Sequence, residues 1–333
     1  MYRADRFSRI EHHSNRTPVV VTAAILIIVA AFALACGTDR QEKKTDPVLK
    51  PTSPSTQPTV GGDVAQTSQP KQVVTFASAQ DAYTKRHYRE AAASFEDYVQ
   101  QHPKNSFGYY MLGLSAWKSG DLDRAHMAFE ESLALDSTNV KTLLNLGRVL
   151  LDQGKPEDAF ARISTAVQLD TTSAEVRRMM GRVESARGQR DSAIASYRVA
   201  LSMDPADSWS MNNLGLLLIE QGRYEEALPP LARAVEIRPE APAFANNLGV
   251  ALERTGHPAA AAEAFRAALK ADSTYTKATV SLVRVEEKSK SDTTTVDVTA
   301  LAQTFNQELQ EARKSRLVAK GVAKPDSVKT PER

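Results

Sequence analysis

The sequence has little of what catalytic, metal-binding or disulfide-stabilised proteins depend on. It contains one cysteine, Cys36, so no disulfide can form within the chain. Its six histidines recur at no metal-ligand spacing, and no second cysteine supplements them. It has no glycine-rich phosphate loop and no serine in a nucleophile elbow. We therefore expect that the protein is not an enzyme and that it holds no metal and no cofactor.

An excess of charge of one sign is also missing. Lysine and arginine total 42 residues against 40 for aspartate and glutamate, and aromatic residues make up only 6% of the chain. Nucleic-acid binding leaves a basic stripe with interleaved aromatics, and the sequence has none. We expect no nucleic-acid partner and no small-molecule substrate.

The N-terminal 36 residues have the pattern of an export signal. Four arginines lie within residues 1–17, and the stretch from Pro18 to Ala35 carries no charge. The junction from Ala33 to Gly37 resembles the lipobox of bacterial lipoproteins, a family in which the signal is cut before the cysteine and the thiol is acylated. That resemblance makes Cys36 the expected site of lipid attachment.

An uncleaved anchor helix is the alternative for the same segment. Val19 to Ala35 is 17 residues long, at the short end of what spans a bilayer. Arginines before the segment place the N-terminus in the cytoplasm. Both interpretations put residues 37–333 outside the cytoplasm, in the bacterial cell envelope, facing the periplasm or the exterior.

Residues 37–72 are rich in proline, serine and threonine and contain few large apolar side chains. Such a segment cannot bury enough surface to offset its ordering entropy, so we expect a disordered linker. Pro51 and Pro54 also form a short polyproline-ligand pattern, although a spacer is the favoured interpretation.

Internal repetition dominates the rest of the chain. Only 15 residues are glycine, yet ten of them form two series whose members are spaced by 34 residues. The first series is Gly113, Gly147, Gly181, Gly215 and Gly249, and the second is Gly120, Gly154, Gly188, Gly222 and Gly256. A large apolar residue recurs with the same step at Phe95, Phe129, Ile163, Tyr197, Leu231 and Phe265.

Helical spacing of the apolar residues between these glycines predicts two helices per unit. The first glycine of each unit would let the two helices approach closely, and the large apolar residue would fill space toward the next unit. The second glycine would sit at a helix end with positive φ. Pro229 and Pro230 are expected in the first turn of a second helix, where their missing N–H groups cost little.

These residues resemble the tetratricopeptide repeat, whose 34-residue unit is a pair of antiparallel helices. The resemblance covers about residues 72–288. The first unit departs from it, with Ala79 and Arg86 in the two glycine positions. We therefore expect an all-α protein, an α-solenoid of antiparallel helix pairs (a tetratricopeptide superhelix) with a disordered N-terminal linker.

The expected boundaries follow from the repeats. Residues 73–288 would form an array of about six repeats plus a capping helix. Residues 289–316 would form a C-terminal capping helix, because apolar residues recur at helical spacing near 296–316. Residues 317–333 would be a flexible tail.

The resemblance also implies where a ligand binds, because in this family the first helix of each pair lines a concave, peptide-binding face. Asparagine can hold a peptide backbone through its donor and acceptor, and exposed tryptophan and arginine often dominate binding energy. Asparagine and tryptophan are also habitual consensus or packing residues in such repeats, so both interpretations stay open. The expected groove residues are Tyr110, Trp117, Asn145, Arg148, Arg178, Arg182, Trp209, Asn212, Asn213, Asn246 and Asn247.

The expected function is a membrane-tethered scaffold outside the cytoplasm that binds proteins or peptides and assists assembly of an envelope complex. Arginines in the groove favour an acidic partner segment. The layout resembles that of pilus-biogenesis lipoproteins with six repeats. The alternative is a regulatory or sensor subunit of an envelope enzyme or of a secretion or pilus system.

Overall fold

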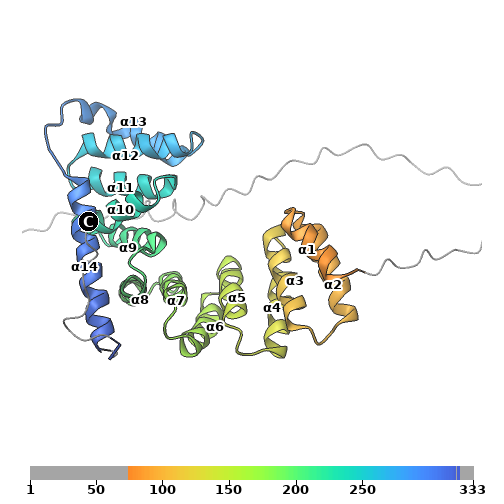
Figure 1. The fold of residues 1–333 in the computed structure, drawn as a ribbon. Coiled ribbons are helices and arrows are strands. Elements are labelled where there is room, and N and C mark those ends of the chain that lie inside the picture. Colours follow the sequence, from red (N-terminus) through yellow and green to blue (C-terminus); the bar gives the residue numbers. More distant parts are fainter. Residues whose placement is uncertain (1–73, 320, 323–333) are drawn as a thin grey trace, which may run out of the picture. The chain divides into compact units, whose positions relative to one another are not determined.

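The computed structural model describes residues 74–319 and 321–322, and these residues form fourteen α-helices without a strand among them (Figure 1). Twelve of the helices form six consecutive pairs, which confirms the predicted solenoid of helix pairs. Cys36, the export-signal segment, the linker of residues 37–72 and most of the expected tail lie outside the described residues.

The pairs share one design, a first helix followed by a short turn and a second helix. The first helices are α1 (Phe76–Thr84), α3 (Ser106–Ser119), α5 (Val140–Asp152), α7 (Ala174–Ala186), α9 (Ser208–Glu220) and α11 (Pro242–Arg254). The second helices are α2 (Tyr88–Gln101), α4 (Leu122–Leu135), α6 (Pro156–Leu169), α8 (Arg190–Met203), α10 (Tyr224–Ile237) and α12 (Pro258–Ala271). The last two helices are α13 (Thr276–Lys290) and α14 (Val298–Ala319).

The second glycine series ends the first helices. Gly120 has φ of 87° and Gly154 has φ of 71°, in the left-handed region that glycine enters without steric cost. Arg86 takes the same place in the first unit and adopts φ of 63°, and it is the one non-glycine residue with positive φ among the described residues. The turn geometry is therefore kept in the first unit, although its sequence departs from the repeat.

The first glycine series allows the two helices of a pair to touch. A Cβ atom on Gly113 would lie 2.7 Å from the ring of Phe129, and one on Gly249 would lie 2.5 Å from the ring of Phe265. The predicted close approach is confirmed. Phe129 packs on the glycine of its own pair, where the missing Cβ atom leaves space directly opposite it.

Pro229 and Pro230 lie inside α10, not in its first turn as expected. The helix begins at Tyr224, so the prolines leave the carbonyls of Glu225 and Glu226 without their usual N–H donors. Pro230 is buried, so packing against the neighbouring helices stabilises a helix that local sequence disfavours.

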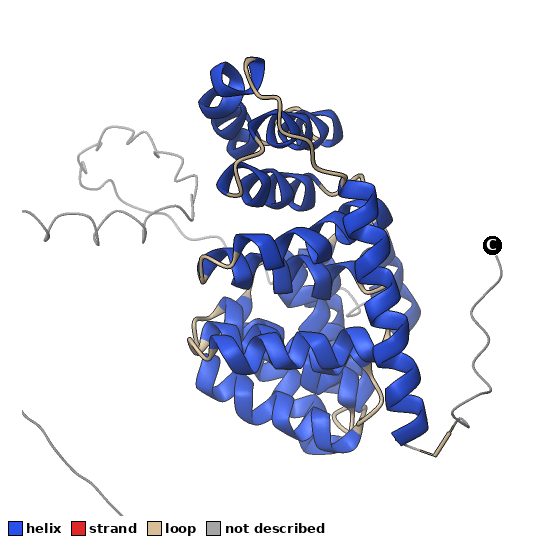
Figure 2. Ribbon diagram, turned by 90° about the vertical axis from the view of Figure 1, so that its left-hand side faces the viewer, coloured by secondary structure: helices blue, strands red, loops and turns tan. Residues whose placement is uncertain are grey.

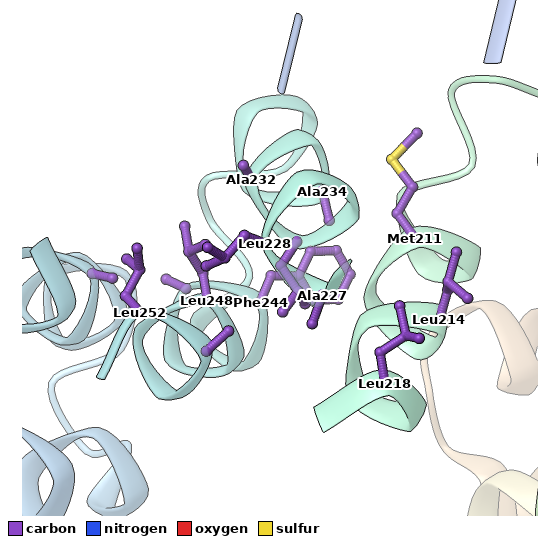
Figure 3. Close-up of a cluster of buried hydrophobic side chains, with 14 of the residues drawn as sticks. Met211, Leu214, Leu218, Ala227, Leu228, Ala232, Ala234, Phe244, Leu248 and Leu252 are labelled. Carbon is purple, nitrogen blue, oxygen red and sulfur yellow. The ribbon is translucent and has the colours of Figure 1, made fainter. Parts of the chain in front are cut away.

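Each helix from α1 to α12 packs against the next one along the chain. The buried side chains gather into two apolar clusters, one within residues 79–183 and one within residues 193–309. Figure 3 shows part of the second cluster, with Leu214 and Leu218 of α9 on one side of Leu228 of α10 and Leu248 and Leu252 of α11 on the other.

The final helix does not cap the array beyond α13. Helix α14 begins at Val298 and packs against α10 and α8 (Figures 1 and 2). Its buried residues are Ala302, Phe305 and Leu309, which recur at helical spacing and join the second apolar cluster. The apolar pattern predicted the helix correctly but not the surface that it covers.

The connection from α13 to α14 is held against the start of α12. The carboxylate of Asp292 accepts a 2.9 Å hydrogen bond from the backbone N–H of Ala259, and the hydroxyl of Thr294 lies 3.1 Å from Nδ1 of His257. The hydrogen bond from Ala259 lowers the pKa of Asp292. These contacts direct α14 back along the array.

Candidate functional site

The predicted groove residues come from five first helices, α3, α5, α7, α9 and α11. Each of these helices contacts the first helix of the next unit, so their outward side chains form a continuous surface, which we call the first-helix face. The sequence analysis placed eleven residues on it. The structure shows that some of their polar groups already form hydrogen bonds or salt bridges within the chain, whereas others do not.

Asn145 belongs to a closed hydrogen-bond network. Its side-chain amide donates to the hydroxyl of Tyr110 at 3.1 Å and its oxygen accepts from Arg148 at 2.6 Å. The side chain is only 6% exposed. Asn145 therefore orients Tyr110 and Arg148 and has little capacity left to hold a peptide.

The asparagines of α9 and α11 are arranged differently. Asn247 donates to the side-chain oxygen of Asn212 at 2.9 Å, and the amide of Asn212 lies 3.5 Å from the oxygen of Asn213. Asn212 and Asn246 are buried, whereas Asn213 and Asn247 are half-buried. The side-chain oxygen of Asn246 finds no hydrogen-bond partner in the part of the chain that the structure describes.

Two of the three arginines are neutralised by carboxylates of the neighbouring unit. Arg148 donates to Glu175 at 2.5 Å, and Arg178 donates at 2.7 Å to Asp207, a buried residue that also caps α9. Arg182 is exposed, and its one hydrogen-bond contact within residues 74–319 is the sulfur of Met179 at 3.9 Å. An open positive patch of three arginines is therefore not formed, and Arg182 is the one of the three that makes no salt bridge with the described residues.

The two tryptophans lie on the first-helix face but in separate units. Nε1 of Trp117 donates to Asp152 at 2.8 Å, which fixes the indole against the next first helix. Trp209 is 48% exposed and rests edge-on against Phe244, with a ring separation of 5.1 Å. Arg238 lies 5.5 Å from the Trp209 ring centre, so this ring has an apolar support below and a cation beside it.

A cleft of about 290 Å³ brings some of these groups together between α7 and α9. Arg182 and Asn213 line it with the exposed Leu216, and Tyr197 of α8 forms part of its wall. Burial raises the pKa of Tyr197, so its hydroxyl stays protonated in the wall of the cleft beside Asn213. The sequence analysis missed Tyr197 as a site residue, because its place in the large apolar column indicated packing alone.

A second cleft, of about 620 Å³, lies away from the first-helix face, between α12 and residues 295–299. Leucine, alanine and valine side chains form most of its walls, and Glu263 and Asp297 supply its carboxylates. Within the described residues no group of three or more histidine, cysteine or acidic side chains is placed to hold a metal ion. None of the described helices is long and apolar enough to cross a membrane.

Comparison with protein families identifies the repeats. Family models described as "Tetratricopeptide repeat" match residues 116–183, 178–242 and 212–276. The comparison with curated proteins finds no match.

Solved structures with the same architecture are numerous. The chain is similar to PilW, a "widely conserved type IV pilus biogenesis factor", at 20% identity over 62% of this chain and 94% of that one, with a TM-score of 0.55. It is similar to the Cut9–Hcn1 assembly at 15% identity over 74% of this chain and 47% of that one, also with a TM-score of 0.55. A third similar structure is MamA, with 29% identity over 50% of this chain and 97% of that one and a TM-score of 0.44. The first two likenesses show the helical solenoid fold.

Proposed function

Because the chain is a tetratricopeptide repeat protein, we propose that it is a scaffold that binds protein or peptide partners on its first-helix face and is held at a bacterial membrane. The observation that carries this proposal is the cleft at Arg182, Asn213 and Leu216. It combines a cation that makes no salt bridge with the described residues, an amide and an exposed apolar side chain, with Glu220 also in its lining. These are groups that an extended peptide can engage together.

The chemistry of this cleft favours a partner segment that carries a carboxylate beside an apolar residue. Arg182 can donate two parallel hydrogen bonds to a carboxylate. Asn213 can add a contact to the peptide backbone, and Leu216, which is 39% exposed, can cover an apolar side chain. Trp209, on the same helix α9, extends the contact area toward α11.

Intramolecular pairing supports a division of roles on the face. Arg148 and Arg178 tie their helices to the next unit through Glu175 and Asp207, so we assign them to holding the first helices in register. Arg182, Asn213, Trp209 and Asn247 remain as the groups for partner contact.

The membrane part of the proposal rests on the sequence before the array. Residues 18–35 form an uncharged apolar run that ends at Cys36, which supports an exported chain attached by a lipid or by the segment itself. In that position the array would recruit or assemble other proteins of the envelope. PilW, a type IV pilus biogenesis factor, has the same fold.

Partner capture tests the binding proposal. The full chain would be crosslinked in envelope preparations and recovered, in parallel with an Arg182→Ala/Asn213→Ala/Trp209→Ala variant. An Arg266→Ala/Met127→Ala variant is the matched control, because both side chains are exposed on second helices. We expect the first variant to lose partners that the control retains. Equal recovery by all three proteins, with unchanged circular dichroism, would contradict the proposal.

Attachment is tested separately by mass. Cys36→Ala is expected to abolish incorporation of a lipid label and to change the mature mass. An unchanged mass without any label in the wild type would favour the uncleaved anchor.

A further inference from the structure

The cleft between α12 and residues 295–299, which we call the α12 cleft, combines apolar walls with two carboxylates. Its volume is about 620 Å³, within the range of pockets that take small ligands (about 300–1,000 Å³). Val296 and Val298 form the apolar part of one wall, and alanines of α12 form the other. The cleft lies away from the first-helix face and is therefore a separate surface.

Three alanines of α12 open the cleft. Ala260, Ala264 and Ala267 follow one another at helical spacing and line it. The corresponding positions of α10, 34 residues earlier, hold larger side chains: Glu226, Pro230 and Arg233. Helix α14 packs along α10 and α8 (Figure 1), so only its first residues lie beside α12. Among the described helices, α12 therefore keeps an open apolar strip where its neighbour α10 is covered.

The wall opposite α12 is held in place at both ends. Before it, the carboxylate of Asp292 accepts a 2.9 Å hydrogen bond from the backbone N–H of Ala259. After it, Oδ1 of Asp297 accepts a 2.8 Å hydrogen bond from the backbone N–H of Ala300 and caps α14. Because both contacts fix the backbone, the cleft is formed before a ligand arrives, and binding does not have to order this segment.

The two carboxylates come from opposite walls of the α12 cleft. Glu263 belongs to α12 and Asp297 to the connection that precedes α14, and both side chains are exposed. Neither forms a salt bridge with the described residues, and Arg266, the nearest arginine to Glu263 along α12, lies against Glu286 of α13 instead. Two acidic groups beside an apolar strip match a cation on an aliphatic stem, because such a side chain buries its methylene groups and keeps its charged head at the rim.

We propose that the α12 cleft binds a lysine or arginine side chain of a protein partner. The stem of that side chain lies between the alanines of α12 and the valines of the opposite wall, and its charged head lies at Glu263 and Asp297. This site goes beyond the proposed function and does not depend on it. The cleft at Arg182 fits an acidic segment, so the array carries two separate sites that select segments of opposite charge.

Fluorescence polarisation of labelled peptides with the full chain in a neutral detergent tests the proposal. The probe is a seven-residue peptide with lysine flanked by two leucines, and three matched peptides carry arginine, norleucine or glutamate in place of lysine. Norleucine keeps the aliphatic stem without the charge. We expect the lysine and arginine peptides to bind roughly tenfold more tightly than the norleucine peptide, because two exposed ion pairs are individually weak and together supply about one factor of ten.

Two variants that remove equal charge locate the site. Glu263→Gln/Asp297→Asn is expected to weaken the lysine peptide roughly tenfold and to leave the norleucine peptide unchanged, and asparagine at position 297 still caps α14. Glu308→Gln/Glu311→Gln is the matched control, because both carboxylates are exposed on α14 and lie outside the cleft. This control is expected to bind all four peptides as the wild type does.

A third variant tests the apolar part of the cleft. Ala267→Leu places a larger side chain at an exposed position of the cleft wall and is expected to weaken the lysine, arginine and norleucine peptides together, with unchanged circular dichroism. Equal binding of this variant and the wild type would overturn the assignment of the stem to the alanine strip.

The outcomes that overturn the whole proposal are distinct from those that concern the first-helix face. Equal affinity for the lysine and norleucine peptides, tighter binding of the glutamate peptide, or no saturable binding of the lysine peptide would each refute it. Equal losses in the two charge-removing variants, or loss of lysine-peptide binding in Arg182→Ala/Asn213→Ala/Trp209→Ala, would place the bound peptide elsewhere and refute it too. Failure of partner capture by the first-helix face leaves these measurements unaffected.

Discussion

Substitution of Gly215 by alanine is expected to loosen the array at its fifth pair. Gly215 lies in α9 directly against Leu231 of α10, and an added Cβ atom would be 2.4 Å from Cγ and 2.6 Å from Cδ2 of that leucine. Ordinary carbon contacts lie near 3.5–4.0 Å. Cγ cannot move away without a change of the whole side chain, and Leu231 is fully buried.

The magnitude follows from two opposing terms. Overpacking of a filled core costs about 1–3 kcal/mol, and a clash with a branch-point carbon belongs near the upper end. Alanine gains about 1 kcal/mol over glycine in helix propensity. We therefore expect a net destabilisation of about 2 kcal/mol, which corresponds to a roughly thirtyfold loss of protection against local opening.

Hydrogen exchange of the α9 and α10 amides is the suitable assay, because repeat arrays unfold in parts and a single melting temperature would average over them. Gly147→Ala is the matched control. Its Cβ atom would lie 2.6 Å from Cδ1 and 2.8 Å from Cγ1 of Ile163, both slightly farther than the two nearest leucine atoms at Gly215, so a smaller loss is expected.

A double-mutant cycle separates the clash from other effects. Leu231→Ala alone should cost about 2–5 kcal/mol through the cavity that it leaves. Combined with Gly215→Ala it should cost less than the two single changes together, by about 2 kcal/mol. If the α9 and α10 amides of Gly215→Ala kept their protection against exchange, or if the free-energy changes in the cycle were additive, the close approach of α9 to α10 would not be what requires glycine at this position.

Three further predictions concern the first turn, a buried phenol and the last helix. Arg86→Gly should stabilise the first pair by about 1 kcal/mol in denaturant unfolding, because it relieves a positive φ, whereas Arg86→Ala should not. Burial raises the pKa of Tyr197 above its ordinary value near 10. The protonated phenol therefore contributes stability below that pH, and this contribution is lost as the pH rises through the folded-state pKa. Stability measured between about pH 9 and pH 11 should consequently fall less in Tyr197→Phe than in the wild type. Phe305→Ala should release α14, raising hydrogen exchange in α14 and α10 while α1 to α4 keep their protection, because α14 contacts α10 and α8; uniform loss of protection would contradict this assignment.

The sequence by itself determined the repeat and its register. Two glycine series with the same spacing predict a close contact between helices and a left-handed turn in each unit. Both features depend only on residues of the helix pair that contains them. For the same reason the second helix and its large apolar residue were predictable residue by residue.

The availability of the side chains on that face was decided by tertiary structure. Arg148 and Arg178 look equivalent to Arg182 in the sequence, but Glu175 and Asp207 neutralise the first two from the following unit. Whether a charge is free depends on which side chains the next unit brings within hydrogen-bond distance, and this is set by how the units stack.

The path of the last helix was decided in the same way. Periodic apolar residues predict that residues near 296–316 form a helix, but the pattern is equally compatible with covering α13 or any other exposed apolar surface. The contacts of Asp292 and Thr294 with the start of α12, and the apolar surface of α10 and α8, direct α14 back along the array. The sequence of a helix specifies which of its faces is apolar. Which surface that face covers depends on where the other helices lie in the folded protein.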